Sequence, residues 1–295
     1  MFNIQARFIS TEHFYLDIDN TETKWPFGDE ELDDYPISLF VDYVPSVDEL
    51  KVNPYNILMI MEPNEYFGLH TFAEKNSQHF TCILTWDQHI LNNCENAVLM
   101  THGLSWLKMP YINSFKNVKK KYEISYLCGV LKKIEGHFIR HKLYERGDEI
   151  IVPKKWFYKL PDCIWNEKKQ EFSRSDFDAK NVCWDESMFH IAIENIKREN
   201  FYTEKILDAF LTKTVPIYYG CPNIGKFFNQ DGIITFDNED EAIHKCNSLT
   251  ENDYYGRIGA INENYKIAKE MFYWSGIVKD WIWDFIKVNN IKKVN

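Results

Sequence analysis

The sequence predicts an α/β protein made of two units, each with a parallel sheet and helices on its faces. Short apolar runs of strand length alternate along the chain with segments whose apolar residues recur at helical spacing. The chain has 295 residues, which suits one large domain or two of ordinary size. Hydrophobic residues make up 45% of it and aromatic residues 16%, enough to bury a substantial core.

The strands and helices are expected from length and composition. Runs such as ILMIM and VPIYY are short and rich in β-branched and aromatic residues, as buried strands are. The expected strands are 57–61, 80–85, 97–100, 124–127, 189–193, 215–219 and 232–236. The expected helices are 137–146, 203–213, 239–249 and 253–271.

A basic segment, KNVKKKYE, reads as a linker and divides the chain into two units. The N-terminal α/β unit is expected over 1–120 and the C-terminal one over 121–275. Within the first unit, the acidic stretch WPFGDEELDDYP is expected to be an exposed loop.

The aromatic tail, residues 276–295, is expected to be an amphipathic helix that packs back on the body. Its apolar residues Ile277, Trp281, Phe285 and Val288 fall at helical spacing. A helix lying on a membrane surface is the alternative. The polar residues of the tail are mixed in sign rather than basic, which disfavours that alternative.

Charge and cysteine content exclude several classes of protein. The formal net charge is −10, which argues against a general nucleic-acid binder, since such a protein needs basic surface. The 7 cysteines form no CxxC pair or Cys/His cluster at metal spacing, so free thiols in a reducing compartment are expected. The start, MFNIQARFIS, is no signal peptide, and no run approaches the roughly 18 apolar residues of a membrane span. A cytoplasmic protein without a transmembrane segment is expected.

The stretch FYTEKILDAF places an acid and a lysine where a helix begins. Thr203 is a good N-cap, which leaves Glu204 and Lys205 in the first turn. The free N–H groups and the helix dipole there favour a phosphate, and Lys205 adds a full positive charge. The Glu204 carboxylate can accept hydrogen bonds from a vicinal diol such as a ribose. A solvated surface pair is the alternative, and no Walker or GxGxxG signature accompanies the stretch.

The surrounding block, IENIKRENFYTEKILDAFLTKTVPIYYGCPNIGKFF, resembles the donor-binding signature of the α1,3-fucosyltransferases, glycosyltransferase family 10. The matching positions, which keep the spacing of the family, are Glu194-Asn195, Thr203-Glu204-Lys205, Asp208-Ala209, Pro216, Tyr218, Gly220 and Pro222.

Two weaker similarities extend this resemblance. SYLCGVLKKIEGHFIRHKLYERG is similar to the first donor-domain strand of the family and to the helix whose arginine reaches the diphosphate, which implies that role for Arg140. IMEPNEYFGLHTFAEKNSQHFTCILTWDQHI is similar to the region that holds the acidic base, where the family has one assigned. Glu62 is the matching carboxylate, and Glu65 competes with it.

The resemblance implies a GT-B architecture, with two Rossmann-like domains facing a cleft and the C-terminal one holding the nucleotide sugar. It implies an inverting transfer of a sugar, with GDP-fucose as the usual donor, to a hydroxyl of a glycan acceptor. The implied donor-binding residues are Arg140, Glu194, Asn195, Glu204, Lys205 and Tyr218.

No cofactor or metal is expected. Lys205, Arg140 and the helix start would supply the positive charge on the leaving diphosphate. The D-x-D strings at Asp17–Asp19 and Asp176–Asp178 are attributed to chance.

The sequence departs from the family pattern at the loop before the helix. Ile196 replaces a serine, and the loop 196–202 is unusually charged. A transferase for another nucleotide sugar (GDP-mannose, UDP-xylose or UDP-glucose) is therefore an alternative, and a non-catalytic carbohydrate- or nucleotide-binding module is another. Because the chain lacks the stem and anchor of Golgi members, it looks like a compact bacterial or viral type.

Overall fold

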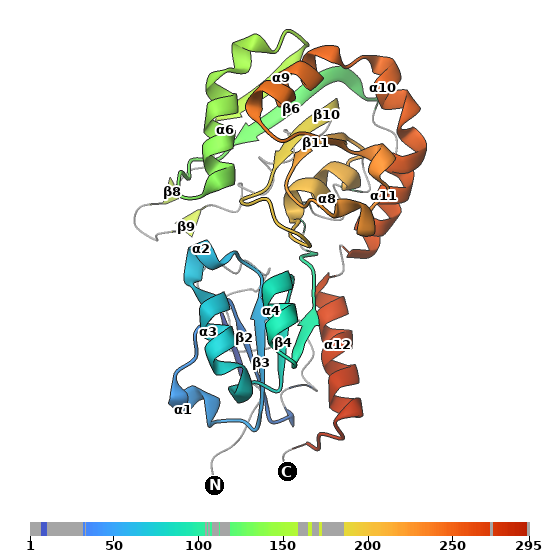
Figure 1. The fold of residues 1–295 in the computed structure, drawn as a ribbon. Helices are drawn as coiled ribbons and strands as arrows, with labels where there is room; N and C mark the ends of the chain where they lie inside the picture. Colours follow the sequence, from blue (N-terminus) through green and yellow to red (C-terminus); the bar gives the residue numbers. More distant parts are fainter. Residues whose placement is uncertain are drawn as a thin grey trace. The chain divides into compact units, whose positions relative to one another are not determined.

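The computed structural model describes residues 7–10, 32, 34–103, 105, 107, 112, 119–158, 165–166, 171–172, 186–271 and 274–293. The chain forms two compact units, one of residues 1–102 with 273–295 and the other of residues 103–272. Each unit contains its own five-stranded sheet, and all the strand pairs in these two sheets are parallel (Figure 1). The predicted α/β class with two Rossmann-like units is confirmed.

The sheet of the first unit follows the order of the chain. Its strands, in spatial order, are β1 (Arg7–Ser10), β2 (Ile37–Val41), β3 (Tyr55–Ile60), β4 (Cys82–Thr85) and β5 (Ala97–Leu99). The helices between them are α1 (Val47–Leu50), α2 (Asn64–Phe67), α3 (Leu69–Asn76) and α4 (Gln88–Asn93). Right-handed crossovers that always step in the same direction place their helices on the same face of a sheet.

A compact cluster shows which face these helices cover. The strand residues of this cluster point to one face of the sheet; they are Phe40 of β2, Leu58 and Ile60 of β3, and Ile83 of β4. They pack with Leu69 and Ala73 of α3 and with Ile90 of α4. These four helices do not cover the opposite face of the sheet. A further described helix, α12 (Trp274–Val288), belongs to this unit but does not connect two of its strands.

The C-terminal tail forms the expected amphipathic helix, but a different stripe is buried. Val278, Ile282 and Ile286 are at most 4% exposed, whereas Ile277 and Val288 are 43% and 79% exposed. Two apolar stripes lie side by side on this helix, and spacing alone does not tell which one is buried. The Trp283 ring meets Tyr35 edge-on, with centroids 5.4 Å apart.

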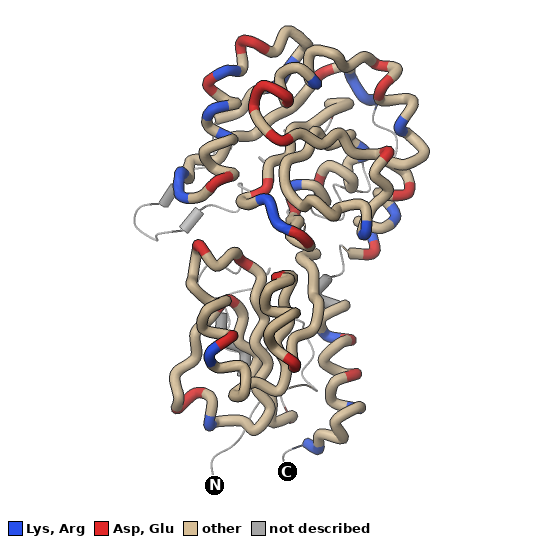
Figure 2. The backbone as a smooth tube through the Cα atoms, viewed as in Figure 1, with Lys and Arg blue, Asp and Glu red and all other residues tan. Residues whose placement is uncertain are grey.

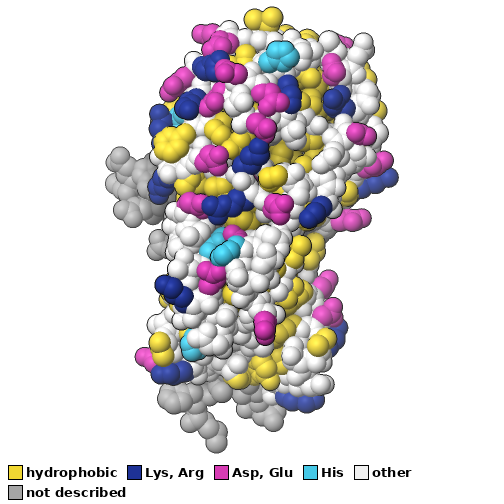
Figure 3. All heavy atoms as spheres, viewed as in Figure 1, with side chains coloured by type: hydrophobic (Ala, Val, Ile, Leu, Met, Phe, Trp, Pro, Cys, Tyr) yellow, Lys and Arg dark blue, Asp and Glu magenta, His cyan; other side chains and the backbone are white. Residues whose placement is uncertain are grey.

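The charges on α12 are of both signs along its length (Figure 2). No helix in the described part of the chain is long and apolar enough to cross a membrane. On the face drawn in Figure 3, lysine and arginine are interspersed with acidic side chains over both units, without a continuous basic surface.

The sheet of the second unit does not follow the order of the chain. Its strands, in spatial order, are β12 (Ile234–Thr235), β11 (Val215–Tyr219), β10 (Ser187–Ile193), β6 (Lys121–Cys128) and β7 (Lys154–Tyr158). The first strand in sequence, β6, therefore lies between its successor β7 and the later strand β10. This is the flavodoxin-like order, and its topological switch point falls between β6 and β10. Ligands of doubly wound folds bind at the carboxyl edge of such a switch point.

Helices surround this sheet, and an extensive core joins both. They are α6 (Glu135–Glu145), α8 (Glu204–Leu211), α9 (Glu239–Ser248), α10 (Glu251–Gly256) and α11 (Ile258–Met271). The short strands β8 (Trp165–Asn166) and β9 (Glu171–Phe172) form a separate antiparallel pair. The single helix expected over 253–271 is two helices, because α10 ends at Gly256 and Arg257 caps it.

Three local expectations differ from the structure. The unit boundary lies at residues 102–103, upstream of the expected one. The end of the basic segment is not a linker, since Lys121 begins β6, where it pairs with Glu186, and Glu123 pairs with Lys155 at 3.0 Å. In the acidic stretch, Leu32 is buried rather than exposed, and most of the remaining residues lie outside the described part.

Candidate functional site

A pocket of about 200 Å³ opens at the switch point of the second unit. Its walls come from the end of β6, from β10, from α6 and from the first turns of α8. The lining residues are Tyr126, Leu127, Gly129, Arg140, His190, Ile191, Ala192, Ile193, Glu204, Lys205 and Asp208. Arg140, Glu204 and Lys205, which come from two distant segments of the sequence, thus line the same pocket.

Arg140 reaches this pocket from α6 and is tethered there. Its Nε and Nη2 atoms donate to the carbonyl oxygen of Ile193 at 3.0 and 2.6 Å, and Nη2 also donates to Asn195 Oδ1 at 2.7 Å. These bonds use one edge of the guanidinium. The side chain is 9% exposed, so the charge is held in a fixed direction at the pocket wall.

The start of α8 is capped as predicted. The Thr203 side chain accepts from the backbone N–H of Lys205 at 3.4 Å, and Glu204 begins the helix. Lys205 Nζ lies 2.9 Å from Glu204 Oε1 and 3.0 Å from Thr203 Oγ1. The side chains of Lys205 and Glu204 are 23% and 13% exposed. An ammonium and a carboxylate therefore stand together where the helix dipole is positive.

Glu194 lies behind the helix start and is not among the described residues that line the pocket. Its two carboxylate oxygens accept from the backbone N–H of Thr203 at 2.8 Å and from the Thr203 hydroxyl at 2.7 Å. Burial raises the pKa of Glu194, and the nearby Lys205 ammonium opposes that shift. Glu194 therefore fixes the N-cap that carries Glu204 and Lys205.

Tyr218 supports Glu194 from β11. Its hydroxyl lies 3.4 Å from Glu194 Oε1 and accepts from the backbone N–H of Cys221 at 3.1 Å. Burial raises the pKa of Tyr218 well above its usual value. A Cβ on Gly220 would lie 2.4 Å from the Tyr218 hydroxyl and 2.5 Å from Glu194 Cγ, so only glycine fits there. Like Glu194, Tyr218 is not among the described pocket-lining residues.

Asn195 joins the end of β10 to α6. Besides accepting from Arg140, it accepts from the backbone N–H of Gly136 through its carbonyl oxygen at 2.9 Å. A Cβ on Gly136 would lie 1.8 Å from the carbonyl oxygen of Glu194. The amino end of α6 is therefore pressed against the backbone of Glu194 and Asn195.

Three polar residues that line the pocket, Tyr126, His190 and Asp208, were not among the implied donor-binding residues. The Tyr126 hydroxyl donates to the carbonyl oxygen of Arg140 at 2.7 Å, and this bond joins β6 to α6. His190 Nδ1 lies 2.8 Å from Ser125 Oγ, and burial lowers the pKa of His190 to about 3, so its ring is neutral at pH 7. Asp208 accepts from the Ser105 hydroxyl at 2.6 Å. The D-A element of the motif was a signal for Asp208, whereas the other two lie within strands.

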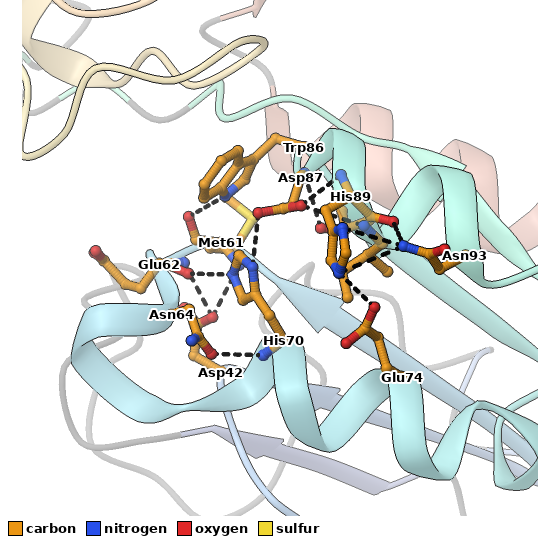
Figure 4. Close-up of polar contacts among 12 residues, drawn as sticks. Asp42, Met61, Glu62, Asn64, His70, Glu74, Trp86, Asp87, His89 and Asn93 are labelled. Carbon is orange, nitrogen blue, oxygen red and sulfur yellow. Dashed lines mark hydrogen bonds and ion pairs between the residues drawn. The ribbon is translucent and has the colours of Figure 1, made fainter.

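Glu62 and Glu65 belong to the first unit. Glu62 follows β3 at the carboxyl edge of that sheet and is half-buried, while Glu65 is exposed in the first turn of α2. Figure 4 shows the Glu62 carboxylate turned away from the ring of His70, although the backbone of Glu62 lies within the polar network around that ring. Glu62 thus combines partial burial with an anchored backbone.

The described residues contain no group of three or more His, Cys, Asp or Glu side chains arranged to hold a metal ion. The strings at Asp17–Asp19 and Asp176–Asp178 lie outside the described residues. Of the cysteines, Cys82, Cys94, Cys128, Cys221 and Cys246 are buried free thiols.

A short stretch of the chain is similar to a known sugar transferase. No family model matches the chain. Over 67 residues, 22% of this chain, it is 39% identical to the alpha-(1,3)-fucosyltransferase FucT of Helicobacter pylori, and the match spans 14% of that protein. The resemblance to the α1,3-fucosyltransferases is confirmed over this stretch.

Solved structures with a similar arrangement include an alpha1,3-fucosyltransferase, with a TM-score of 0.48, 15% identity and coverage of 81% of this chain and 78% of that one. TarM is similar with a TM-score of 0.47, 11% identity and coverage of 83% and 54%. A T4 phage BGT mutant in complex with UDP-glucose is similar with a TM-score of 0.41, 9% identity and coverage of 85% and 73%.

Proposed function

We propose that this protein is an inverting glycosyltransferase that moves fucose from GDP-fucose to a hydroxyl of a glycan acceptor without a metal ion. The supporting observation is that Arg140, Glu204 and Lys205 line one pocket at the switch point of a doubly wound sheet. The similarity to a curated alpha-(1,3)-fucosyltransferase supports the choice of sugar.

The pocket suits a nucleoside diphosphate. The guanidinium of Arg140 and the ammonium of Lys205 neutralise the diphosphate, and the amino end of α8 adds its dipole and its free N–H groups. The Glu204 carboxylate accepts hydrogen bonds from the ribose diol. Glu194, Tyr218 and Asn195 hold these groups in place.

The same charges stabilise the leaving group during transfer. In a single displacement the acceptor oxygen bonds to the anomeric carbon as the bond from that carbon to the diphosphate oxygen breaks. Negative charge then builds up on the departing GDP, where Arg140 and Lys205 meet it. Two fixed cations at the diphosphate take the place that a divalent metal has in other transferases.

A carboxylate must take the proton of the acceptor hydroxyl as the new bond forms. Glu62 fits this role best because its backbone is anchored and its side chain is half-buried, as described above. Glu65, exposed on a short helix, is the second candidate.

The loop before α8 favours a second candidate function, transfer of another sugar on the same scaffold. Ile196, at the position of the family's serine, is 3% exposed and so places an apolar side chain in the interior. The loop is fixed by Asn200, whose amide oxygen and backbone N–H pair with the Asn223 side chain at 2.8 Å each, and by Lys197, which lies 2.5 Å from Asp237. A loop held so firmly selects its sugar by shape.

Calorimetry with GDP-fucose, GDP-mannose, UDP-xylose and UDP-glucose, each with and without EDTA, tests both candidates. We expect GDP-fucose to bind most tightly and to be consumed at the same rate when EDTA is present. Preference for another of these donors establishes the second candidate. Binding of none of them contradicts both.

A further inference from the structure

The backbone of Met61 and Glu62 is hydrogen-bonded by side chains from other segments of the first unit. β3 ends at Ile60, so the N–H groups of Met61 and Glu62 lie beyond the strand. Both donate to the same atom, Asp42 Oδ1, from Met61 at 2.8 Å and from Glu62 at 3.1 Å. Asp42 follows the neighbouring strand β2, so these two hydrogen bonds join the carboxyl ends of two adjacent strands.

The two carbonyl groups are also engaged (Figure 4). The Trp86 indole, which follows β4, donates to the carbonyl oxygen of Met61 at 2.8 Å. His70 Nε2, on α3, lies 3.5 Å from the carbonyl oxygen of Glu62. Four backbone polar groups of two consecutive residues thus face side chains from three different segments.

His70 is itself held in place. Its Nδ1 atom lies 2.7 Å from Asp87 Oδ2, and both side chains are 7% exposed. The other oxygen of Asp87 caps α4 by accepting from the backbone N–H groups of His89 and Ile90. The His70 ring meets Trp86 edge-on, with centroids 5.5 Å apart. His70 therefore cannot turn without disturbing α4 and Trp86.

Holding Asp42 in this position has a cost in folding free energy. Asp42 is 2% exposed and has a φ of 47°, a left-handed conformation that residues other than glycine seldom adopt. Burial raises the pKa of Asp42 to about 6. An ordinary turn satisfies the same N–H groups with water at no such cost, and strained, buried polar groups of this kind cluster at functional sites.

We infer that Asp42, His70 and Trp86 are positioning residues, which hold the Met61–Glu62 backbone so that the Glu62 carboxylate meets the acceptor hydroxyl in one orientation. This inference rests on the proposed function, with Glu62 as the base. In this role the three act through the Met61–Glu62 backbone and not by contact with the reacting atoms. Their contribution is to the rate of the chemical step, where a displacement of about 1 Å lowers the rate about 100-fold.

The test compares Asp42→Gly with Asp42→Asn in the full chain. Glycine and asparagine both tolerate the left-handed conformation, but only asparagine retains an oxygen that accepts the two N–H bonds. Asp48→Asn, which changes an exposed carboxylate on α1, is the control for loss of charge. The measurements are amide hydrogen exchange at Met61 and Glu62, GDP affinity, and kcat and KM for release of GDP from GDP-fucose.

We expect Asp42→Gly to speed exchange at both amides by about tenfold or more and to lower kcat by about 100-fold, with GDP affinity and the KM for GDP-fucose unchanged. Asp42→Asn is expected to restore most of kcat. Faster exchange with an unchanged kcat, or loss of kcat in Asp42→Asn equal to that in Asp42→Gly, would overturn the inference. A wild-type protein that neither binds nor turns over GDP-fucose contradicts the proposed function instead, and the positioning role is then rejected with it, even if the exchange rates respond as expected.

Discussion

Asn195 Oδ1 accepts a hydrogen bond from Arg140 Nη2 at 2.7 Å and so joins the end of β10 to α6. One edge of the guanidinium is thereby fixed, which leaves the other edge to meet a ligand. The direction of the Arg140 charge depends on a residue that is not itself among the described residues lining the pocket.

Asn195→Ala is expected to weaken GDP binding about tenfold, because Arg140 loses a charge-assisted hydrogen bond and becomes mobile. Arg140→Ala is expected to weaken it about 100-fold. The double variant should be no weaker than Arg140→Ala alone, since Asn195 acts through Arg140. Calorimetry on the three variants measures this coupling, and additive losses would show that Asn195 acts independently.

Lys205→Ala is expected to weaken GDP binding by about 2 kcal/mol, because a charge-assisted contact to phosphate is lost. Guanosine, which has no phosphate, is the matched ligand and should bind both proteins equally. The deficit should shrink as salt concentration rises. An equal loss for guanosine would assign Lys205 to the nucleoside rather than to the diphosphate.

Glu204→Ala is expected to abolish discrimination between GDP and 2′,3′-dideoxy-GDP, since the carboxylate is the proposed acceptor for the ribose hydroxyls. In the wild-type protein GDP should bind about tenfold more tightly than its dideoxy analogue. Titration of both ligands into both proteins closes a thermodynamic cycle. Persistent discrimination in Glu204→Ala would place the ribose elsewhere.

Gly136→Ala is expected to lower the free energy of unfolding by about 3 kcal/mol or more. The added Cβ would overlap the carbonyl oxygen of Glu194 at 1.8 Å, and backbone atoms on both sides resist displacement. Gly259→Ala, in α11, is the control, because no heavy atom lies within 4 Å of the place that its added methyl group would take and alanine favours a helix. Urea unfolding of both variants measures the difference, and equal stabilities would refute the close approach of α6 to Glu194.

Acid is expected to destabilise the fold through His190. Its pKa is about 3 in the folded protein against 6.5 for the free side chain, so the unfolded chain binds the proton first as pH falls. Stability present above pH 6.5 is therefore lost toward pH 3, by a total of about 5 kcal/mol. His190→Asn, which stays neutral, should flatten this part of the pH profile of urea unfolding. His244→Asn, at an exposed position, is the control for the replacement of a histidine.

The start of α8 was the most predictable part of the candidate site. An N-cap and its first turn are local features, so Thr203, Glu204 and Lys205 lie where the sequence places them. The pocket itself is not a local feature. It exists because β6 and β10 are neighbours at a switch point, and strand order depends on the whole chain.

Glu194 and Tyr218 show the limit of motif matching. A motif preserves residues that support a site as well as those that touch a ligand, and only burial separates the two roles. In the structure both lie beneath the helix start, with exposures of 0% and 1%. Asp42 escaped prediction because nothing in its sequence neighbourhood shows that it reaches Met61 and Glu62 at the end of the adjacent strand.

The first unit draws on both ends of the described chain, and this has a consequence for biosynthesis. Its sheet is translated early, but α12 emerges only after the whole second unit. At about 5–20 residues per second, the ribosome needs of the order of ten seconds or more to cover that interval. During this time Val278, Ile282 and Ile286, which are buried in the finished protein, have not yet joined the first unit. A nascent chain stalled before residue 274 should therefore be a client for chaperones, even though its second unit can already be complete.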